Sequence, residues 1–261
     1  MRSRSLTALH SPQQDSWASG LSEEVRDKSF GGQGMKERIK EVAIELLVRH
    51  GYQGFRFRDL AERLGTTRAN IHYYYGSKLN LAEEVIVDYV RETLASWREN
   101  WSSNKSFEQK IAGMMEANRR RYLRFNPTEA TANPWSLIGR MRMERDVIGP
   151  NARAALVEFG VVLENMIVSA IESAIKRGEL TPEIPIRDVA LQLVAIADSA
   201  GPITQDGGSF ERLEKLYLSF ARIVNHAYGT KRPLKAHPPD GQARVPKLSR
   251  GGGTRRVSKD I

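Results

Sequence analysis

The chain has 261 residues, of which 40% are apolar, so it is long and apolar enough to bury the core of one or two domains. Lysine and arginine (40) exceed aspartate and glutamate (31) by nine, and this excess indicates a polyanionic partner, either nucleic acid or an anionic membrane surface. The absence of cysteine excludes a disulfide framework, a thiolate nucleophile and a zinc–thiolate site.

Residues 1–34 are polar and show no periodicity, which predicts a flexible N-terminal arm. The first 20 residues lack the apolar run of a secretory signal. No stretch reaches the roughly 18 uncharged apolar residues needed to cross a bilayer. We therefore expect a soluble, cytoplasmic protein with no membrane partner.

Apolar residues at three- and four-residue intervals predict a helix from Ile39 that stops at His50-Gly51. Two short helices follow at residues 57–64 and 68–75. A fourth helix begins near Ser77 and runs to about Trp101. Residues 35–80 are thus predicted to form a small domain of three helices.

Helical periodicity continues through residues 81–229, the predicted second and larger domain. Asn133-Pro134 has the pattern of a cap followed by a proline at the first helical position, so it predicts a helix through Met143. Gly149-Pro150 is predicted to end this segment of the chain. Further helices are predicted at residues 107–125, 156–175, 187–200 and 210–227. No strand pattern and no internal repeat occur, so the predicted fold class is all-α.

Residues 230–261 are predicted to be a disordered basic tail. From Lys231 onward there are nine basic residues against Asp240 and Asp260, and nine minus two gives +7 of the total +9. The basic balance of the whole chain is therefore weak evidence about its folded body.

The spacing within residues 57–75 is that of a helix-turn-helix. Ala61 is small where two helices cross, Gly65 stands where a tight turn needs a positive φ, and Ile71 faces inward. Thr66 or Thr67 can cap the second helix of the pair by accepting a hydrogen bond from a free backbone N–H.

A helical wheel centred on Ile71 separates the tyrosines of this segment. Thr67, Tyr74 and Tyr75 lie within roughly 60° of Ile71, so we expect Tyr75 to pack inward and Tyr74 to lie at the boundary with its hydroxyl free for a phosphate. The residues expected to project outward offer donors, an amide and an aromatic edge that match DNA bases and phosphates; they are Arg68, Ala69, Asn70, His72 and Tyr73.

Residues 36–86, which include "GTTRANIHYYYGSK" at 65–78, resemble the TetR family of bacterial one-component regulators (TetR/AcrR-type). The resemblance lies in a helix, a Gly-aromatic turn, a helix-turn-helix ending in aromatic residues, and a Ser-Lys pair that opens the next helix. It implies that Lys78 clamps a phosphate, that Asn70 and Tyr73 approach bases, and that Arg68 does either. It further implies that Thr67, His72 and Tyr74 hold the DNA backbone. The alternative is that Arg68 and Lys78 are ordinary solvated charges and that Tyr74 belongs to the core.

Three positions depart from the family pattern. Arg56 stands where Ser or Thr usually caps the second helix, and Ala69 replaces a frequent Gly. His72 stands where a Tyr usually touches phosphate. A neutral imidazole donates one hydrogen bond, and a protonated one donates two and adds charge.

The resemblance implies a homodimer, because two half-sites about one helical turn apart require two recognition helices. In the family, the last two long helices form the interface. Here those helices offer residues that are also plausible core positions: Leu191, Val194, Ala195, Asp198, Leu213, Tyr217, Phe220 and Val224.

The middle helices resemble the family's effector chamber in architecture only. The candidate effector-binding residues are Met115, Asn118, Tyr122, Trp135, Met141, Phe159 and Met166. The same stripes also fit a simple core. Asn118, on an apolar face, needs either a ligand or a neighbouring polar group as partner. The arginines at 119, 120, 121 and 124 could attract an anionic effector or form a solvated face.

These features predict a transcriptional regulator, most simply a dimeric repressor that a small-molecule effector releases from its double-stranded DNA operator. The alternative is a constitutive or architectural DNA-binding protein without an effector. No catalytic motif, metal-ligand spacing or phosphate loop occurs, so neither enzymatic activity, nor a cofactor, nor a metal is expected. When bound to DNA, the protein is expected at the nucleoid.

Overall fold

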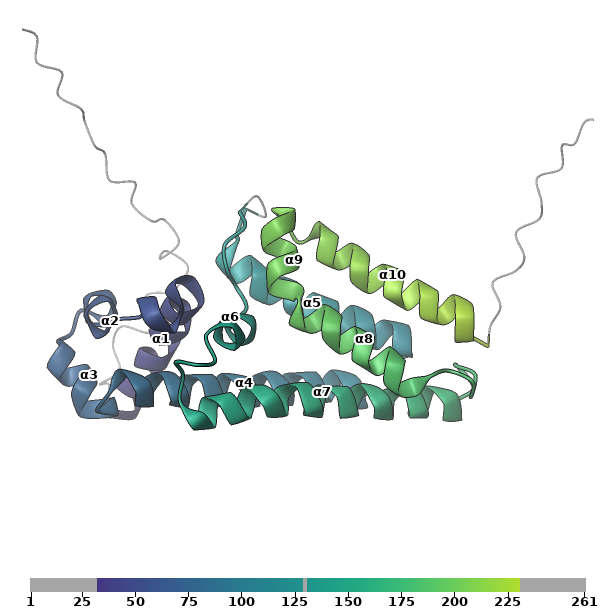
Figure 1. The fold of residues 1–261 in the computed structure, drawn as a ribbon, viewed down its shortest axis with the longest axis horizontal. Coiled ribbons are helices and arrows are strands. Elements are labelled where there is room, and N and C mark those ends of the chain that lie inside the picture. The colour runs from purple at the N-terminus through teal and green to yellow at the C-terminus, as the bar shows by residue number, and fades with distance from the viewer. Residues whose placement is uncertain (1–31, 129–130, 231–261) are drawn as a thin grey trace, which may run out of the picture.

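The computed structural model describes residues 32–128 and 131–230, and this part of the chain is helical, as the sequence predicts (Figure 1). An isolated bridge between Leu180 and Gly229 is the one β-type pairing in these two ranges. The predicted arm, except residues 32–34, and the predicted tail, except Thr230, lie outside them. The helices are α1 (Gly32–Gly54), α2 (Phe57–Leu64), α3 (Arg68–Tyr75), α4 (Lys78–Ser102), α5 (Phe107–Phe125), α6 (Leu137–Met143), α7 (Pro150–Lys176), α8 (Ile186–Asp198), α9 (Ala200–Gly207) and α10 (Glu211–Tyr228).

Helices α1, α2 and α3 form a small unit at one end of the molecule (Figure 1). Gly51, with φ 69°, interrupts α1 at the predicted terminator. Gly65 ends α2 in the left-handed conformation with φ 63°, where its N–H bonds the last carbonyls of the helix. Leu47, Leu60 and Ile71, one from each helix, are fully buried. The predicted helix-turn-helix is therefore present.

Helix α4 leaves this unit and runs into the body side by side with α7 (Figure 1). Ser77 caps α4 by accepting a hydrogen bond from the backbone N–H of Asn80 at 3.1 Å. Among the described residues, α7 is the one helix long and apolar enough to cross a membrane by length and composition. Its packing against both α4 and α8 accounts for much of this apolar character.

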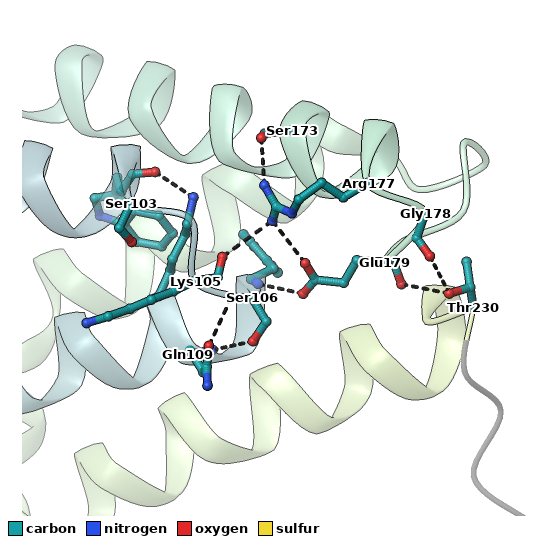
Figure 2. A network of polar contacts seen from close by, with 12 residues as sticks. Ser103, Lys105, Ser106, Gln109, Ser173, Arg177, Gly178, Glu179 and Thr230 are labelled. Atoms are coloured by element: carbon teal, nitrogen blue, oxygen red, sulfur yellow. Dashed lines mark hydrogen bonds and ion pairs between the residues drawn. The ribbon is translucent and has the colours of Figure 1, made fainter.

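A polar network joins α5, α7 and α10 at the end of the body away from α1–α3 (Figure 2). The Arg177 guanidinium donates to Ser173 Oγ at 2.7 Å and lies 3.0 Å from a Glu179 carboxylate oxygen. Glu179 also accepts from the backbone N–H of Phe107, at the start of α5. Thr230 Oγ1 donates to the Gly178 carbonyl at 2.6 Å, which attaches the end of α10.

Several helices differ from the sequence prediction. Helix α1 begins at Gly32 rather than Ile39, so residues 32–34 of the predicted flexible arm are helical. Helix α6 begins at Leu137, because Ser136 caps it and Asn133 instead bonds Asn126 and the Phe125 carbonyl. Helix α7 begins at Pro150, so Gly149-Pro150 starts this helix as well as ending the segment before it. Helix α9 was not predicted, since its sequence, AGPITQDG, contains proline and two glycines.

The residues of α10 that were expected either at a dimer interface or in the core lie in the core. Leu213, Tyr217, Phe220 and Val224 are buried within their own chain, where α10 packs on α5, α8 and α9. The opposite side of α10 exposes Leu218 and Ile223. On α8, Val194 is buried and Asp198 pairs with Arg142. Leu191 and Ala195 are exposed.

Candidate nucleic-acid interface and ligand cavity

Two adjacent threonines start α3. Thr67 Oγ1 accepts a hydrogen bond from the backbone N–H of Asn70 at 3.1 Å, which makes Thr67 the cap. Thr66 Oγ1 accepts from the side-chain amide of the same asparagine at 2.9 Å. The Asn70 amide, predicted to approach bases, is half-buried and already donates one hydrogen bond within the turn. At the start of α2, Arg56 makes no capping bond, as its type predicts.

The inner side of α3 is anchored by Ile71 and Tyr75. Ile71 is fully buried and Tyr75 is 5% exposed. The Tyr75 hydroxyl donates to the Lys36 carbonyl of α1 at 3.1 Å. Burial, together with the negative charge of Glu84, raises the pKa of Tyr75 to about 12. Tyr75 therefore fixes the orientation of α3 against α1.

The outer side of α3 is open to solvent. Tyr73 is 83% exposed, and Arg68 and Ala69 are also exposed. Tyr74 is half-buried, and its ring meets that of Tyr73 edge to face at 5.3 Å between centroids. We call Arg68, Ala69 and Tyr73 the outer face of α3. An aromatic ring, a guanidinium and a methyl group on one short helix suit contact with base edges in a major groove.

His72 lies on the flank of α3 and is held by two contacts. Its Nδ1 lies 2.8 Å from the Gly76 carbonyl oxygen, and its ring meets Phe57 of α2 at 4.8 Å between centroids. Since a carbonyl can only accept, Nδ1 must carry the proton. In the neutral ring, Nε2 is then an acceptor, and it becomes a donor to a phosphate only when the imidazole is protonated.

Lys78, the first residue of α4, is held against the α1–α2 turn. Its Nζ lies 4.5 Å from the centroid of the Tyr52 ring and 3.4 Å from the Gln53 carbonyl oxygen. Partial burial lowers the pKa of its ammonium group. The contacts place a cation at the N-terminus of α4, near the helix-turn-helix.

A cavity lies in the body between α4, α5, α6, α7 and α8. The space between its walls, including the part open to solvent, is about 410 Å³, but the centre of a water-sized sphere can move in only about 30 Å³ of it. Side chains therefore fill most of the cavity. Its walls consist of Tyr89, Thr93, Trp97, Asn118, Arg121, Trp135, Ser136, Ile138, Gly139, Arg142, Phe159, Ala197 and Asp198.

Along one wall of this cavity, two guanidinium groups lie on either side of a pair of aromatic rings. The Arg121 guanidinium lies 5.6 Å from the centroid of the Trp97 ring, and the Trp97 ring lies 5.3 Å from that of Phe159. The Arg142 guanidinium follows at 5.5 Å from Phe159 and forms an ion pair with Asp198. Cation–π contacts of this kind hold charged groups beside apolar surface.

Three of the seven predicted effector residues line the cavity. Asn118 donates to the Tyr217 hydroxyl at 2.9 Å, and Trp135 Nε1 donates to Thr204 Oγ1 at 2.7 Å. Phe159 belongs to the wall just described. The other four residues do not line it: Tyr122 and Met141 are fully buried in the core, and Met115 and Met166 pack half-buried against the core.

The sequence prediction missed the contribution of α4 to the cavity. Tyr89, Thr93 and Trp97 recur at intervals of four residues, so they share one side of the helix. That spacing was available in the sequence and could have identified this wall. Arg142 and Asp198 carried no such signal, because their pairing joins α6 to α8.

Of the four arginines at 119, 120, 121 and 124 in α5, three lie beside acidic side chains and one lines the cavity. Arg119 lies near Glu214, Arg120 pairs with Glu116, and Arg124 pairs with Glu45. Arg121 lines the cavity instead. Within the described ranges, no group of three or more histidine or acidic side chains could hold a metal ion.

Helix α6 connects the cavity to the helix-turn-helix unit. Ile138, Gly139 and Arg142 face the cavity. At its end, Glu144 accepts a hydrogen bond from the Gln53 backbone N–H at 3.0 Å and pairs with Arg140 at 3.1 Å.

Two further contacts lie near the hydrogen bond between Glu144 and Gln53. A Cβ added at Gly51 would overlap the Glu144 carboxylate, so the left-handed glycine allows this close approach. Glu83 of α4 accepts from the backbone N–H of Asn151 at 2.6 Å and so caps the start of α7.

Comparisons with known proteins agree with this geometry. Residues 39–85 match a family model described as "Bacterial regulatory proteins, tetR family". A comparison with curated protein sequences gives no significant match.

Solved structures share the fold of most of the chain at low sequence identity. A TetR-family transcriptional regulator from Agrobacterium tumefaciens is 18% identical with a TM-score of 0.64, over 74% of this chain and 98% of that chain. A TetR transcriptional regulator from Chloroflexus aurantiacus is 22% identical with a TM-score of 0.63, over 76% and 98%. A protein from Saccharomonospora viridis, solved in complex with choline, is 20% identical with a TM-score of 0.61, over 76% and 98%.

Proposed function

We propose that this chain, whose residues 39–85 match the model of the tetR family of bacterial regulatory proteins, is a dimeric repressor that a small molecule releases from its operator. The observation that carries the proposal is the position of α6. One side of this helix lines the cavity, and Glu144 at its end accepts a hydrogen bond from Gln53 in the last turn of α1. A change in the cavity wall can therefore move the DNA-binding unit.

In this proposal the outer face of α3 reads the operator. Tyr73 and Arg68 contact base edges, and Lys78, Thr67 and Tyr74 contact phosphates and hold the register. His72 contributes a phosphate contact mainly when it is protonated, because its Nδ1 is directed to the Gly76 carbonyl. Asn70 already donates one amide hydrogen to Thr66, so its second amide hydrogen and its side-chain oxygen are what it can offer to a base.

The dimer in this proposal forms through exposed apolar residues of α8 and α10. Leu191 is 59% exposed and Ile223 is 67% exposed, and Leu218 lies on the outer side of α10 with Ile223. Apolar side chains left exposed on two packed helices are typical of an interface with another protein surface. A twofold axis through this surface places one α3 on each side, as two half-sites require.

In this proposal a ligand releases the protein from DNA because the cavity must expand to admit it. Only about 30 Å³ is open to the centre of a water-sized sphere, so a ligand must displace Trp97, Phe159 or α6 to enter. It binds the expanded state better than the state described here. By linkage, the ligand then lowers operator affinity by the same factor by which the operator lowers ligand affinity.

The neighbour from Saccharomonospora viridis, solved with choline, supports the idea that a body of this fold accommodates a small molecule. It does not indicate the same ligand here, because the walls of the present cavity carry Arg121 and the Arg142–Asp198 pair. A quaternary ammonium ion beside Arg121 would be repelled.

Selection of bound sequences from a random DNA pool, with the full-length protein, tests the proposal. The expected result is a palindromic motif with half-sites about 10 bp apart or a multiple of that distance. Recovered sequences without a common motif would instead support the alternative of a constitutive, architectural DNA-binding protein. A compound that weakens binding to the selected motif would identify the effector.

A further inference from the structure

The strongest unexplained feature of the cavity is the charge of Arg121. No ion pair joins Arg121 to a carboxylate within residues 32–128 and 131–230, although the other three arginines of its run each have an acidic side chain within 4 Å. Its guanidinium lies against the ring of Trp97 instead. Arg121 is thus placed differently from its neighbours on α5.

The surroundings of Arg121 do not compensate its charge. Burial lowers its pKa, and the groups that act on it electrostatically are the phenols of Tyr89 and Tyr217 and the guanidinium of Arg120. A partly buried cation without an anion close by is unfavourable. An anion that entered the cavity would remove that cost.

The charges of the cavity wall sum to one positive charge. Arg121 and Arg142 contribute two positive charges and Asp198 contributes one negative charge, which leaves +1. Because Asp198 already pairs with Arg142, the uncompensated charge lies at Arg121. The cavity is therefore complementary to a monoanion.

The remaining walls suit an apolar or aromatic body. Trp97, Trp135, Ile138 and Phe159 all line the cavity. Trp97, a residue of the cavity wall, carries a buried indole N–H that makes no hydrogen bond to any described residue, so it is a second donor available to a ligand. A guanidinium and an N–H together match the two oxygens of a carboxylate.

We propose that the effector is an apolar carboxylate, preferably one with an aromatic ring, whose acid group pairs with Arg121 while its ring lies among Trp97, Trp135 and Phe159. The inference rests on the proposed function, since it assigns the cavity as the effector site. It adds the chemical class of the effector and the residue that selects it.

Calorimetric titration of the full-length protein with two matched probes, 2-naphthoate and 2-naphthamide, tests the proposal. The probes have the same ring and nearly the same shape, and only the first carries a charge. We expect the naphthoate to bind about tenfold more tightly or better, the difference typical of one charge-assisted contact. Equal affinities, a preference for the amide, or no binding of either probe at millimolar concentration would overturn the inference.

Variants of adjacent arginines supply the matched control. Arg121→Gln should reduce the preference for naphthoate to about twofold or less, Arg121→Lys should retain part of it, and Arg120→Gln should leave it unchanged. In the absence of a probe, Arg121→Gln should melt at the same temperature as the wild type or a few degrees higher, because an unpaired charge is removed. A lower melting temperature would assign Arg121 a structural role and contradict the proposal.

A parallel titration with the selected operator separates this inference from the proposed function. A protein that binds its operator but shows no carboxylate preference retains the regulator assignment and loses the effector class. A protein that prefers the carboxylate through Arg121 but reads no DNA sequence retains the cavity assignment and loses the regulator.

Discussion

Glu144 accepts a hydrogen bond from the backbone N–H of Gln53 at 3.0 Å, across 91 positions of the sequence. The bond joins the end of α6, a helix that lines the cavity, to the last turn of α1 in the DNA-binding unit. Arg140 pairs with the same carboxylate at 3.1 Å and holds it in place. This contact connects the cavity region directly to the DNA-binding unit.

Removing the carboxylate should loosen the turn at the end of α1. In Glu144→Ala we expect the peptide that contains Gln53 to exchange its amide hydrogens faster, since that N–H loses its acceptor. The free energy of unfolding should fall by about 0.5–1.5 kcal/mol. Hydrogen exchange measured by mass spectrometry checks the first effect and denaturant unfolding the second. Glu116→Ala, which removes an exposed carboxylate of α5, should leave exchange at Gln53 unchanged; equal exchange in both variants would disprove the connection.

Tyr73 is expected to carry sequence-specific contacts, because its ring projects from α3 and is 83% exposed. Tyr73→Ala should lose about 1–3 kcal/mol of operator binding free energy while its melting temperature stays near that of the wild type. Fluorescence anisotropy with the selected operator and with a scrambled duplex measures the loss. Leu79→Ala, at another partly exposed apolar residue, serves as the control. Undiminished affinity in Tyr73→Ala would show that the outer face of α3 does not read DNA.

A charge at Ile223 should separate the proposed dimer. Ile223 is 67% exposed on the outer side of α10, so a glutamate there meets water in the monomer but would be desolvated in an interface. Sedimentation equilibrium should find Ile223→Glu as a folded monomer with much weaker operator binding. Met143→Glu, at a residue of α6 that is 83% exposed, should remain dimeric. A dimer of unchanged strength in Ile223→Glu would place the interface elsewhere.

The helix-turn-helix was the part best predicted from sequence, because its determinants are local. The positive φ of Gly65, the burial of Ile71 and the cap at Thr67 each depend on residues within a few positions. The exposed Tyr73 and buried Tyr75 followed from the angle between successive residues of one helix. The predicted start of α6 is three residues too early, because Asn133 bonds back to α5 rather than capping a helix.

The cavity was harder to predict, since its walls come from five helices. An apolar residue on a helix has the same periodicity whether it packs in a core or lines a cavity, so Met141 and Tyr122 could not be distinguished from Phe159. The direction of Arg121 depends on Trp97, 24 positions earlier in the chain. For the same reason, the apolar stripe of α10 did not reveal whether it faced its own chain or a partner.

The most direct test of the regulator assignment is the structure of the full-length protein bound to its selected operator. We expect two copies of the chain related by a twofold axis, each with α3 in a major groove and Tyr73 in contact with a base edge. A complex in which α3 faces away from the duplex, with the DNA held by another surface, would contradict the account.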